Sequence, residues 1–555
     1  MTSTTAPETP GAGPRRWWGL VAISVAVALI IVDSTIVNVA VPYLVGDLAL
    51  TSSEVQWVQE SYTLVFAATL LVWGTVADRV GRRRMLLIGI AVFVAASLLA
   101  TQADSGGALI ATRIVQGLGG AMILPTTLSL INAGFTGRDR GIAFAVWGST
   151  IGGVVALGPL LGGWLTTAFS WRWAFGINLP IGAAVAAGVL LHVAESRAPR
   201  TRGVDGFGAV LSATAFAALA FGLIEGRTYG WWMLAHPLEV GPLRWPWALS
   251  PVPIALAVSA LLLATFVVRT LRRGAAGRPT LLRFDLFGLP SFRNGNIAAM
   301  IVSLGEFGIV LSLPLWLQNV LGFTAFQTGL VLLGLAGGSF AASGVSAALA
   351  GRLGPVGIVR IGLVAEVVGV TLLGLLLSPS TTWPLVVAPL VVYGFGVGLA
   401  TAQLTGVVLV DVPVRRSGEA SGVQSTSRQI GSALGIAVLG TVLFASVGAQ
   451  LEASLRTTGL PEPARTAIVQ AVVDSAGGAI PALAGNPATA IAHEPARQAF
   501  TDGTRYAAFT AAGFLLLGLA ASFSLGSGRR RSDLDGAEQS SLPPQRPAQA
   551  GLVSR

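Results

Sequence analysis

The stretch Gly74-Thr75-Val76-Ala77-Asp78-Arg79-Val80-Gly81-Arg82-Arg83-Arg84 decides how this chain folds. It joins two apolar segments, 54–77 and 84–102, each near the roughly 20 residues that a helix needs to cross a bilayer. Its arginines are typical of the cytoplasmic side of a membrane, and its glycines permit a tight turn. The stretch therefore predicts a short inner loop between two transmembrane helices.

The rest of the chain is equally apolar. Of its 555 residues 53% are hydrophobic and only 11% are charged, whereas a soluble domain is about 25% charged. Only helices can span a membrane in stretches this long and apolar. The sequence predicts about fourteen such helices, the other twelve over 18–43, 107–131, 141–167, 172–194, 205–226, 250–270, 294–320, 327–350, 355–377, 383–410, 418–446 and 504–527.

The charged residues orient these helices. All 35 basic residues are arginine, and most fall on one side when the N-terminus is placed in the cytoplasm. This bias predicts a multi-pass protein of the cytoplasmic membrane with both termini inside, and it explains the net charge of +10 without nucleic acid. The absence of cysteine excludes disulfides and thiolate metal sites, and the three histidines have no ligand spacing.

An internal repeat predicts the domain organisation. Asp78-Arg79-Val80-Gly81 resembles Gly351-Arg352-Leu353-Gly354, and two further pairs of segments recur at nearly the same offset. Chance similarity between apolar segments is the alternative. A parallel repeat is typical of transporters that rock one half against the other. We expect six-helix bundles at 18–194 and 294–527, two inserted linker helices in 205–270, cytoplasmic tails at 1–17 and 528–555 (the latter disordered), and an outer loop at 447–503 with a surface helix near 463–474.

Three motifs carry a resemblance to a known family. The stretch 74–84 resembles the signature loop of the major facilitator superfamily, and the run from Arg113 to Gly120 resembles its second motif. Gly158-Pro159-Leu160-Leu161-Gly162-Gly163 resembles the motif of its exporters, although Val154 stands where a fuller pattern has glycine. Four other segments extend the resemblance to the fourteen-helix drug:proton antiporters over residues 17–527: Trp57–Tyr62, Trp171–Pro180, Leu317–Gly322 and Arg428–Gly435.

This resemblance implies an all-α protein of the major facilitator fold that exports lipophilic, cationic drugs or antibiotics in exchange for protons. A dedicated exporter of a natural product, lipid or sugar is the alternative. A proton-coupled importer and a membrane enzyme or receptor are weaker ones, and no nucleotide-binding loop suggests an ATP-driven pump. We expect no enzymatic activity, cofactor, metal or nucleic acid. The partners expected are a small-molecule substrate, protons and the lipid bilayer, the proton gradient is the energy source, and the protein acts as a monomer.

Buried acids are the candidates for proton coupling. Asp33 lies in the apolar first span, where a charge is costly and usually functional. Arg113, which stays charged, is its nearest partner in the topology, although a static ion pair is the alternative. Glu306 ranks second, and Glu60 could be an outer proton port. Glu366 ranks last because a structural pairing explains it equally well.

A second group of residues is expected to close the two bundles on the inside. The repeat places Asp78 opposite the start of the thirteenth helix near Gly418, and a helix N-terminus carries a positive partial charge that favours an anion. We therefore predict a conformational latch at Asp78, although a simple positive-inside anchor is the alternative. The other latch residues are Gly74, Arg79, Gly81 and Arg82.

The exporter motif and the cavity wall complete the predicted site. Gly158, Pro159, Gly162 and Gly163 are expected to let the fifth helix bend and pack tightly. Aromatic and polar side chains would line a substrate cavity in which a carboxylate attracts cations. The predicted wall residues are Trp147, Gln116, Phe307, Trp316, Gln318, Gln424 and Arg428.

Overall fold

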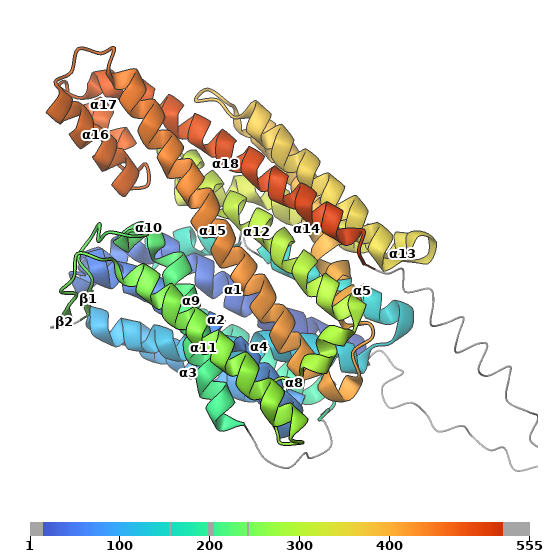
Figure 1. Ribbon diagram of the computed structural model, residues 1–555. Coiled ribbons are helices and arrows are strands. Elements are labelled where there is room, and N and C mark those ends of the chain that lie inside the picture. The colour runs from blue at the N-terminus through green and yellow to red at the C-terminus, as the bar shows by residue number, and fades with distance from the viewer. Residues whose placement is uncertain (1–14, 51, 155–156, 198–204, 241–242, 526–555) are drawn as a thin grey trace, which may run out of the picture.

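A computed structural model describes residues 15–50, 52–154, 157–197, 205–240 and 243–525. The expected tails at 1–17 and 528–555 fall almost wholly outside these residues. The described chain is nearly all helical, as predicted (Figure 1). It contains thirteen helices that are long and apolar enough to cross a membrane.

The N-terminal half is a bundle in which the sixth span is divided into two helices. The fifth span, expected over 141–167, includes residues 155–156, which lie outside the described residues, and neither described part on either side of them counts as a full span. The helices are α1 (Arg15–Leu48), α2 (Ser52–Val80), α3 (Arg82–Thr101), α4 (Gly106–Gly134), α5 (Gly137–Val154), α6 (Leu157–Ala168), α7 (Arg172–Gly176) and α8 (Asn178–His192).

The inserted pair of helices lies beside the N-terminal half. In this pair α9 packs against α11, where the Ser259 hydroxyl donates to the Ala215 carbonyl at 2.9 Å, and α9 also contacts α2 and α15. Asp205 begins α9 by accepting a hydrogen bond from the backbone of Gly208, and it also pairs with Arg269 of α11 at 2.8 Å. The elements are α9 (Gly206–Ile224), α10 (Gly226–Tyr229), β1 (Glu239–Val240), β2 (Leu243–Arg244), α11 (Pro251–Ala275) and the 3-10 helix η1 (Phe284–Gly288).

The C-terminal half contains a helix that turns back on itself. Within α13, Gly354 has a φ of 66°, which glycine adopts without strain, and Pro355 follows it. The break separates the tenth span from the eleventh, as predicted. The elements are α12 (Pro290–Asn319), α13 (Ala325–Leu376), α14 (Trp383–Leu409), η2 (Val414–Arg416), α15 (Ser417–Leu455), α16 (Glu462–Asp474), α17 (Ile480–Gly485), η3 (Ala490–Ala492) and α18 (His493–Ser522).

The expected outer loop at 447–503 is largely helical. α15 continues to Leu455 and α18 begins at His493, so the connection between them is shorter than predicted. The surface helix expected near 463–474 is present as α16, which packs against the extension of α15. The small orange helices around the end of α15 in Figure 1 are this region.

The two halves meet along glycine-lined helix crossings. α15 crosses α2 and α4, and α5 crosses α13 and α14. A Cβ atom added to Gly74 would lie 2.5 Å from the Gly418 carbonyl oxygen, and one added to Gly148 would lie 2.8 Å from the Ala402 Cα atom. The backbones of the two halves are therefore in direct contact, which positions the residues described next.

Candidate functional site

The N-terminal half contains a buried ion pair. Asp33 of α1 is fully buried, and its Oδ2 accepts a hydrogen bond from Arg113 of α4 at 2.6 Å. Arg113 also donates to the Val58 carbonyl at 3.1 Å, and its guanidinium stacks over the Tyr62 ring at 4.4 Å. The structure thus pairs the two residues that the topology predicted.

Neutral side chains complete the hydrogen bonds of Asp33. Its Oδ1 accepts from Asn178 at 2.6 Å and from Gln116 at 3.1 Å, and both amides also donate to the Ser97 hydroxyl. Gln116, which was expected in the cavity wall, belongs to this network. Asn178 and Ser97 were missed, although Asn178 lies in the motif Trp171–Pro180. The carboxylate is therefore saturated with donors, which offsets the cost of burying its charge.

The C-terminal half contains a second pair. Glu306 of α12 accepts from Arg428 of α15 at 3.2 Å and from the Thr401 hydroxyl of α14 at 2.7 Å. The Tyr393 hydroxyl donates to the backbone carbonyl of Glu306 at 3.2 Å. Glu366 of α13, which ranked last among the candidate acids, is fully buried within electrostatic range of this pair.

Glu60 lies in a different environment. It is half-buried on α2 and faces the inserted segment, where burial, followed by the negative charge of Glu60, raises the pKa of Tyr229 to about 12. The structure therefore places Glu60 beside Tyr229 of the inserted segment.

The latch residues meet at the crossing of α2 and α15. The two carboxylate oxygens of Asp78 accept from the backbone N–H groups of Gly418 and Glu419, each at 2.9 Å. Arg82 donates to the same carboxylate at 2.6 Å and to the Val414 carbonyl at 2.5 Å. The expected contact at the start of α15 is present, and we call this end of the bundle the latch end.

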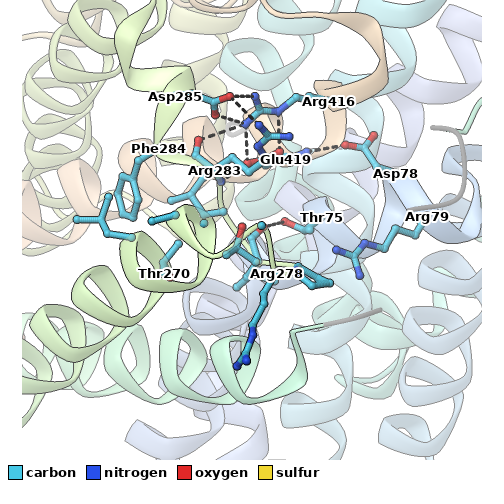
Figure 2. A pocket seen from close by; sticks show the side chains of 18 of the residues that line it. Thr75, Asp78, Arg79, Thr270, Arg278, Arg283, Phe284, Asp285, Arg416 and Glu419 are labelled. Atoms are coloured by element: carbon cyan, nitrogen blue, oxygen red, sulfur yellow. Dashed lines mark hydrogen bonds and ion pairs between the residues drawn. The ribbon is translucent and has the colours of Figure 1, made fainter. Parts of the chain in front are cut away.

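The glycines of the signature loop make this geometry possible. Gly81 has a φ of 115°, which non-glycine residues rarely adopt, and it places Arg82 at the start of α3. Gly74 lies against the backbone of Gly418, so a side chain at either position would push α15 away from Asp78. Arg79 instead points into a neighbouring pocket (Figure 2).

A second layer of charges supports the latch. Glu419 accepts from the Arg283 backbone N–H at 2.6 Å and from the Arg416 side chain at 3.0 Å. Arg416 also binds Asp285, as Figure 2 shows. Burial alone would raise the pKa of Asp285, but the hydrogen bond from Arg416 and the charges of Arg416 and Arg283 outweigh it and lower this pKa. These contacts border a pocket of about 800 Å³ between α2, α11 and α15.

The exporter motif packs α6 between the two halves. A Cβ atom on Gly158 would lie 1.8 Å from the Thr35 hydroxyl of α1, two residues beyond Asp33. Gly162 is buried, and Gly163 faces Phe326 of α13 at 3.6 Å. Pro159 lies in the helix. The motif thus brings α6 into close contact with the helix that carries the first buried acid.

The structure divides the predicted wall residues. Trp147 and Trp316 are buried within their own halves, where their indole N–H groups donate to Thr127 at 3.2 Å and to Thr501 at 3.0 Å. Phe307 is 37% exposed and Gln318 is half-buried, both on α12. Gln424 donates to Thr405 at 3.0 Å and lies one turn before Arg428 on the same face of α15. Gln116 contacts the first buried pair, Arg428 belongs to the second, and Gln424 lies on the same face of α15 as Arg428.

Comparisons with known proteins agree with this architecture. The family model "Major Facilitator Superfamily" matches residues 23–436. The "Probable actinorhodin transporter" of Streptomyces coelicolor is 34% identical over 81% of this chain and 77% of that protein. The "Tetracenomycin C resistance and export protein" of Streptomyces glaucescens is 29% identical over 97% of this chain and 96% of its own, and the "Multidrug efflux pump LfrA" of Mycolicibacterium smegmatis is 31% identical over 95% and 98%.

Solved structures show the same fold. The human organic anion transporter MFSD10 (TETRAN) superposes with a TM-score of 0.56 over 92% of this chain and 100% of its own, at 14% sequence identity. The proton:xylose symporter XylE superposes with a TM-score of 0.56 over 91% and 94%, at 13% identity. At these identities the likeness concerns the fold alone. The helical architecture and the family match together show that the chain is a multi-pass membrane protein of the major facilitator superfamily.

Proposed function

We propose that this protein is a proton-coupled antiporter that exports lipophilic cations, including drugs or antibiotics, across the cytoplasmic membrane. The observation that carries the proposal is that each half buries a carboxylate–arginine pair: Asp33 with Arg113, and Glu306 with Arg428. Charges inside membrane-spanning helices are costly and usually mark an ion or substrate pathway. The relatives named for drug or antibiotic export support the direction of transport.

The pairs can exchange partners. A proton on Asp33 would remove the charge that holds Arg113, Gln116 and Asn178, and these donors would then be free to rearrange. A cationic substrate can compete with Arg428 for Glu306 in the same way. Because each occupancy favours a different set of contacts, binding a proton and binding a substrate can select different access states.

Asp78 supplies the conformational element in this proposal. Its bonds to the first turn of α15 hold the two halves together at the latch end, where Arg82, Arg83 and Arg84 also lie. We place this end in the cytoplasm, together with both chain termini, because enrichment in arginine favours that side of the membrane. The described conformation is thus closed toward the cytoplasm, and opening it requires α15 to leave Asp78.

The proton gradient is the energy source that we propose, and the transporter works as a monomer without a cofactor or enzymatic activity. Among the described residues, no group of three or more His, Cys, Asp or Glu side chains is placed to hold a metal ion.

A dedicated exporter of one natural product is the second candidate. Two relatives are named for a single antibiotic, actinorhodin and tetracenomycin C, rather than for many drugs. Growth of a sensitive host expressing the protein, measured against a panel of chemically unrelated antibiotics, separates the candidates. Protection against one scaffold favours the dedicated exporter, and protection against several cations favours broad export.

Transport by the purified protein tests the central proposal. Proteoliposomes with an imposed pH gradient should accumulate ethidium, a lipophilic fluorescent cation, against its concentration gradient. Collapsing the pH gradient with a protonophore should abolish the accumulation. Ethidium movement that does not depend on the pH gradient contradicts proton antiport. Proton movement in the same direction as ethidium contradicts it as well.

A further inference from the structure

Glu366 is a buried acid to which the proposed exchange has so far given no role. It lies in the second helical segment of α13 and has no exposed surface. Within the described residues, neither of its carboxylate oxygens has a hydrogen-bond partner. A carboxylate buried without donors is costly, and a proton removes that cost.

Close helix packing keeps Glu366 in this position. A Cβ atom added to Gly396 of α14 would lie 2.7 Å from the Glu366 Cγ atom and 2.5 Å from its backbone nitrogen. The missing side chain at Gly396 thus makes the space in which the acid is enclosed. Because α13 and α14 touch through their backbones here, the carboxyl cannot swing out to lipid without separating the helices.

The groups around Glu366 belong to the second buried pair. The charges of Glu306 of α12 and Arg428 of α15 act on Glu366. The charges of both acids also act on Tyr393 of α14. Two other arginines lie near α13. Arg505 of α18 donates to the Gly374 carbonyl, about 12 Å along α13 from Glu366, and Arg360 of α13 donates to the Ser522 carbonyl. The cluster thus contains two acids and one nearby guanidinium.

The guanidinium of Arg428 has a spare donor. Its Nη2 donates a hydrogen bond to Glu306, whereas its Nη1 is buried without an acceptor in the described residues. A donor without an acceptor and a carboxyl without a donor therefore occur in the same cluster. If Glu366 lost its proton, the carboxylate formed would have an available partner once the arginine shifted toward it.

We infer that Glu366 is a second proton-binding site, protonated in this conformation while Glu306 is ionised, and that it releases its proton as Arg428 moves from Glu306 toward Glu366. The inference rests on the proposed proton antiport. It assigns the C-terminal half one transported proton, which is carried by the carboxyl group of Glu366 and leaves as a hydrogen ion when Arg428 changes partner.

Infrared spectroscopy of the ligand-free protein in lipid tests the first part. At neutral pH the wild type should show the C=O stretching band of a neutral, buried carboxyl group, and Glu366→Gln should lose it. Glu452→Gln, which removes a surface acid paired with Arg456, is the matched control and should leave the band unchanged. If Glu366→Gln does not fold, Glu366→Asp should shift the band. A band that neither variant alters overturns the inference.

Transport stoichiometry tests the second part. In proteoliposomes Glu366→Gln should move one proton fewer per ethidium than the wild type. A lost band with an unchanged ratio identifies a structural carboxyl and overturns the transport role. A wild type that moves ethidium without protons overturns the proposed antiport and with it this role, whereas the infrared result still decides whether Glu366 is protonated, so the two failures are distinguishable.

Discussion

The two halves of the molecule solve the same electrostatic problem differently. Asp33 and Glu306 are 273 positions apart, the offset that also relates Asp78 to Gly351, so they occupy equivalent places in the repeat. Asp33 receives hydrogen bonds from three side chains. In the C-terminal half, Glu306 and Glu366 share one arginine, Arg428. Under the proposed assignment, the supply of hydrogen-bond donors, and not burial alone, decides whether a membrane-embedded acid carries a charge or a proton.

Replacing Asp33 should have the largest effect on transport and stability of the changes considered in the two halves. Asp33→Asn leaves Arg113 charged and buried without its counter-ion, which typically destabilises a protein by about 3–5 kcal/mol. We expect ethidium accumulation driven by the pH gradient to fall more than about tenfold, together with a lower melting temperature.

Asp47→Asn is the matched control, because Asp47 lies on the same helix but is exposed and pairs with Arg172. It should transport normally. Full transport by Asp33→Asn would show that the N-terminal pair is not part of proton coupling.

A glycine substitution in the exporter motif sharpens the view of the N-terminal half. Gly158→Ala places a methyl group against Thr35, so α6 must move away from α1 at a cost of about 1–3 kcal/mol. A thermal melt in detergent measures this. Gly163→Ala, whose methyl group meets Phe326 at an ordinary 3.6 Å, should melt near the wild type. Equal melting of the two variants would contradict close α1–α6 packing.

The latch variant tests how the halves separate. Asp78→Asn removes the negative charge from the first turn of α15, an interaction worth about 0.3–1 kcal/mol at exposed sites and up to about 2 kcal/mol when partly buried. Because the chain has no cysteine, Ser421→Cys supplies a single label site that is buried in the closed state. Maleimide should label it several-fold faster in the Asp78→Asn background, and unchanged labelling would argue against a latch.

The smallest expected effect concerns the second layer at the latch end. The pKa of Asp285 is lowered in the folded protein, so its pairing with Arg416 contributes stability above the unfolded pKa near 3.9 and loses it as the pH falls through the lower folded value. Because Asp285 is half exposed, the contribution should be within about 1 kcal/mol.

Melting temperature against pH measures this small term. Asp285→Asn should reduce the loss of stability between about pH 5 and pH 2 slightly, while leaving the stability at pH 7 within the same margin. If the variant instead lost more stability than the wild type as the pH falls, the pairing of Asp285 with Arg416 would not stabilise the folded protein.

Much of this arrangement was predictable. Apolar segments and arginine bias predict the helices, and the repeat predicts that Asp78 lies near Gly418. Asp33 and Arg113 are recognisable because a charge in an apolar span needs a partner. Such signals are strong because few alternatives are physically acceptable.

The remaining features depend on side-chain direction, which sequence spacing does not fix. Ser97 is a neutral residue in an apolar helix and gives no signal until it points at Asp33, whereas the only sequence signal at Asn178 is its place in the motif Trp171–Pro180. Trp147 and Trp316 have the composition of cavity walls but turn into their own bundles. Glu366 ranks last from the sequence because a structural pairing explains it equally well, and only the enclosed space opposite Gly396 shows its isolation.

The length of α15 has a mechanical consequence. Its 39 residues form a rod of about 58 Å, nearly twice the thickness of the hydrocarbon core of a bilayer. One end of the rod rests on Asp78, Arg428 lies about a third of the way along, and the other end is braced by α16. A tilt at any of these points must move the others. In the proposed orientation the braced end lies outside the cell, so an antibody fragment that clamps it should block transport without touching the cargo.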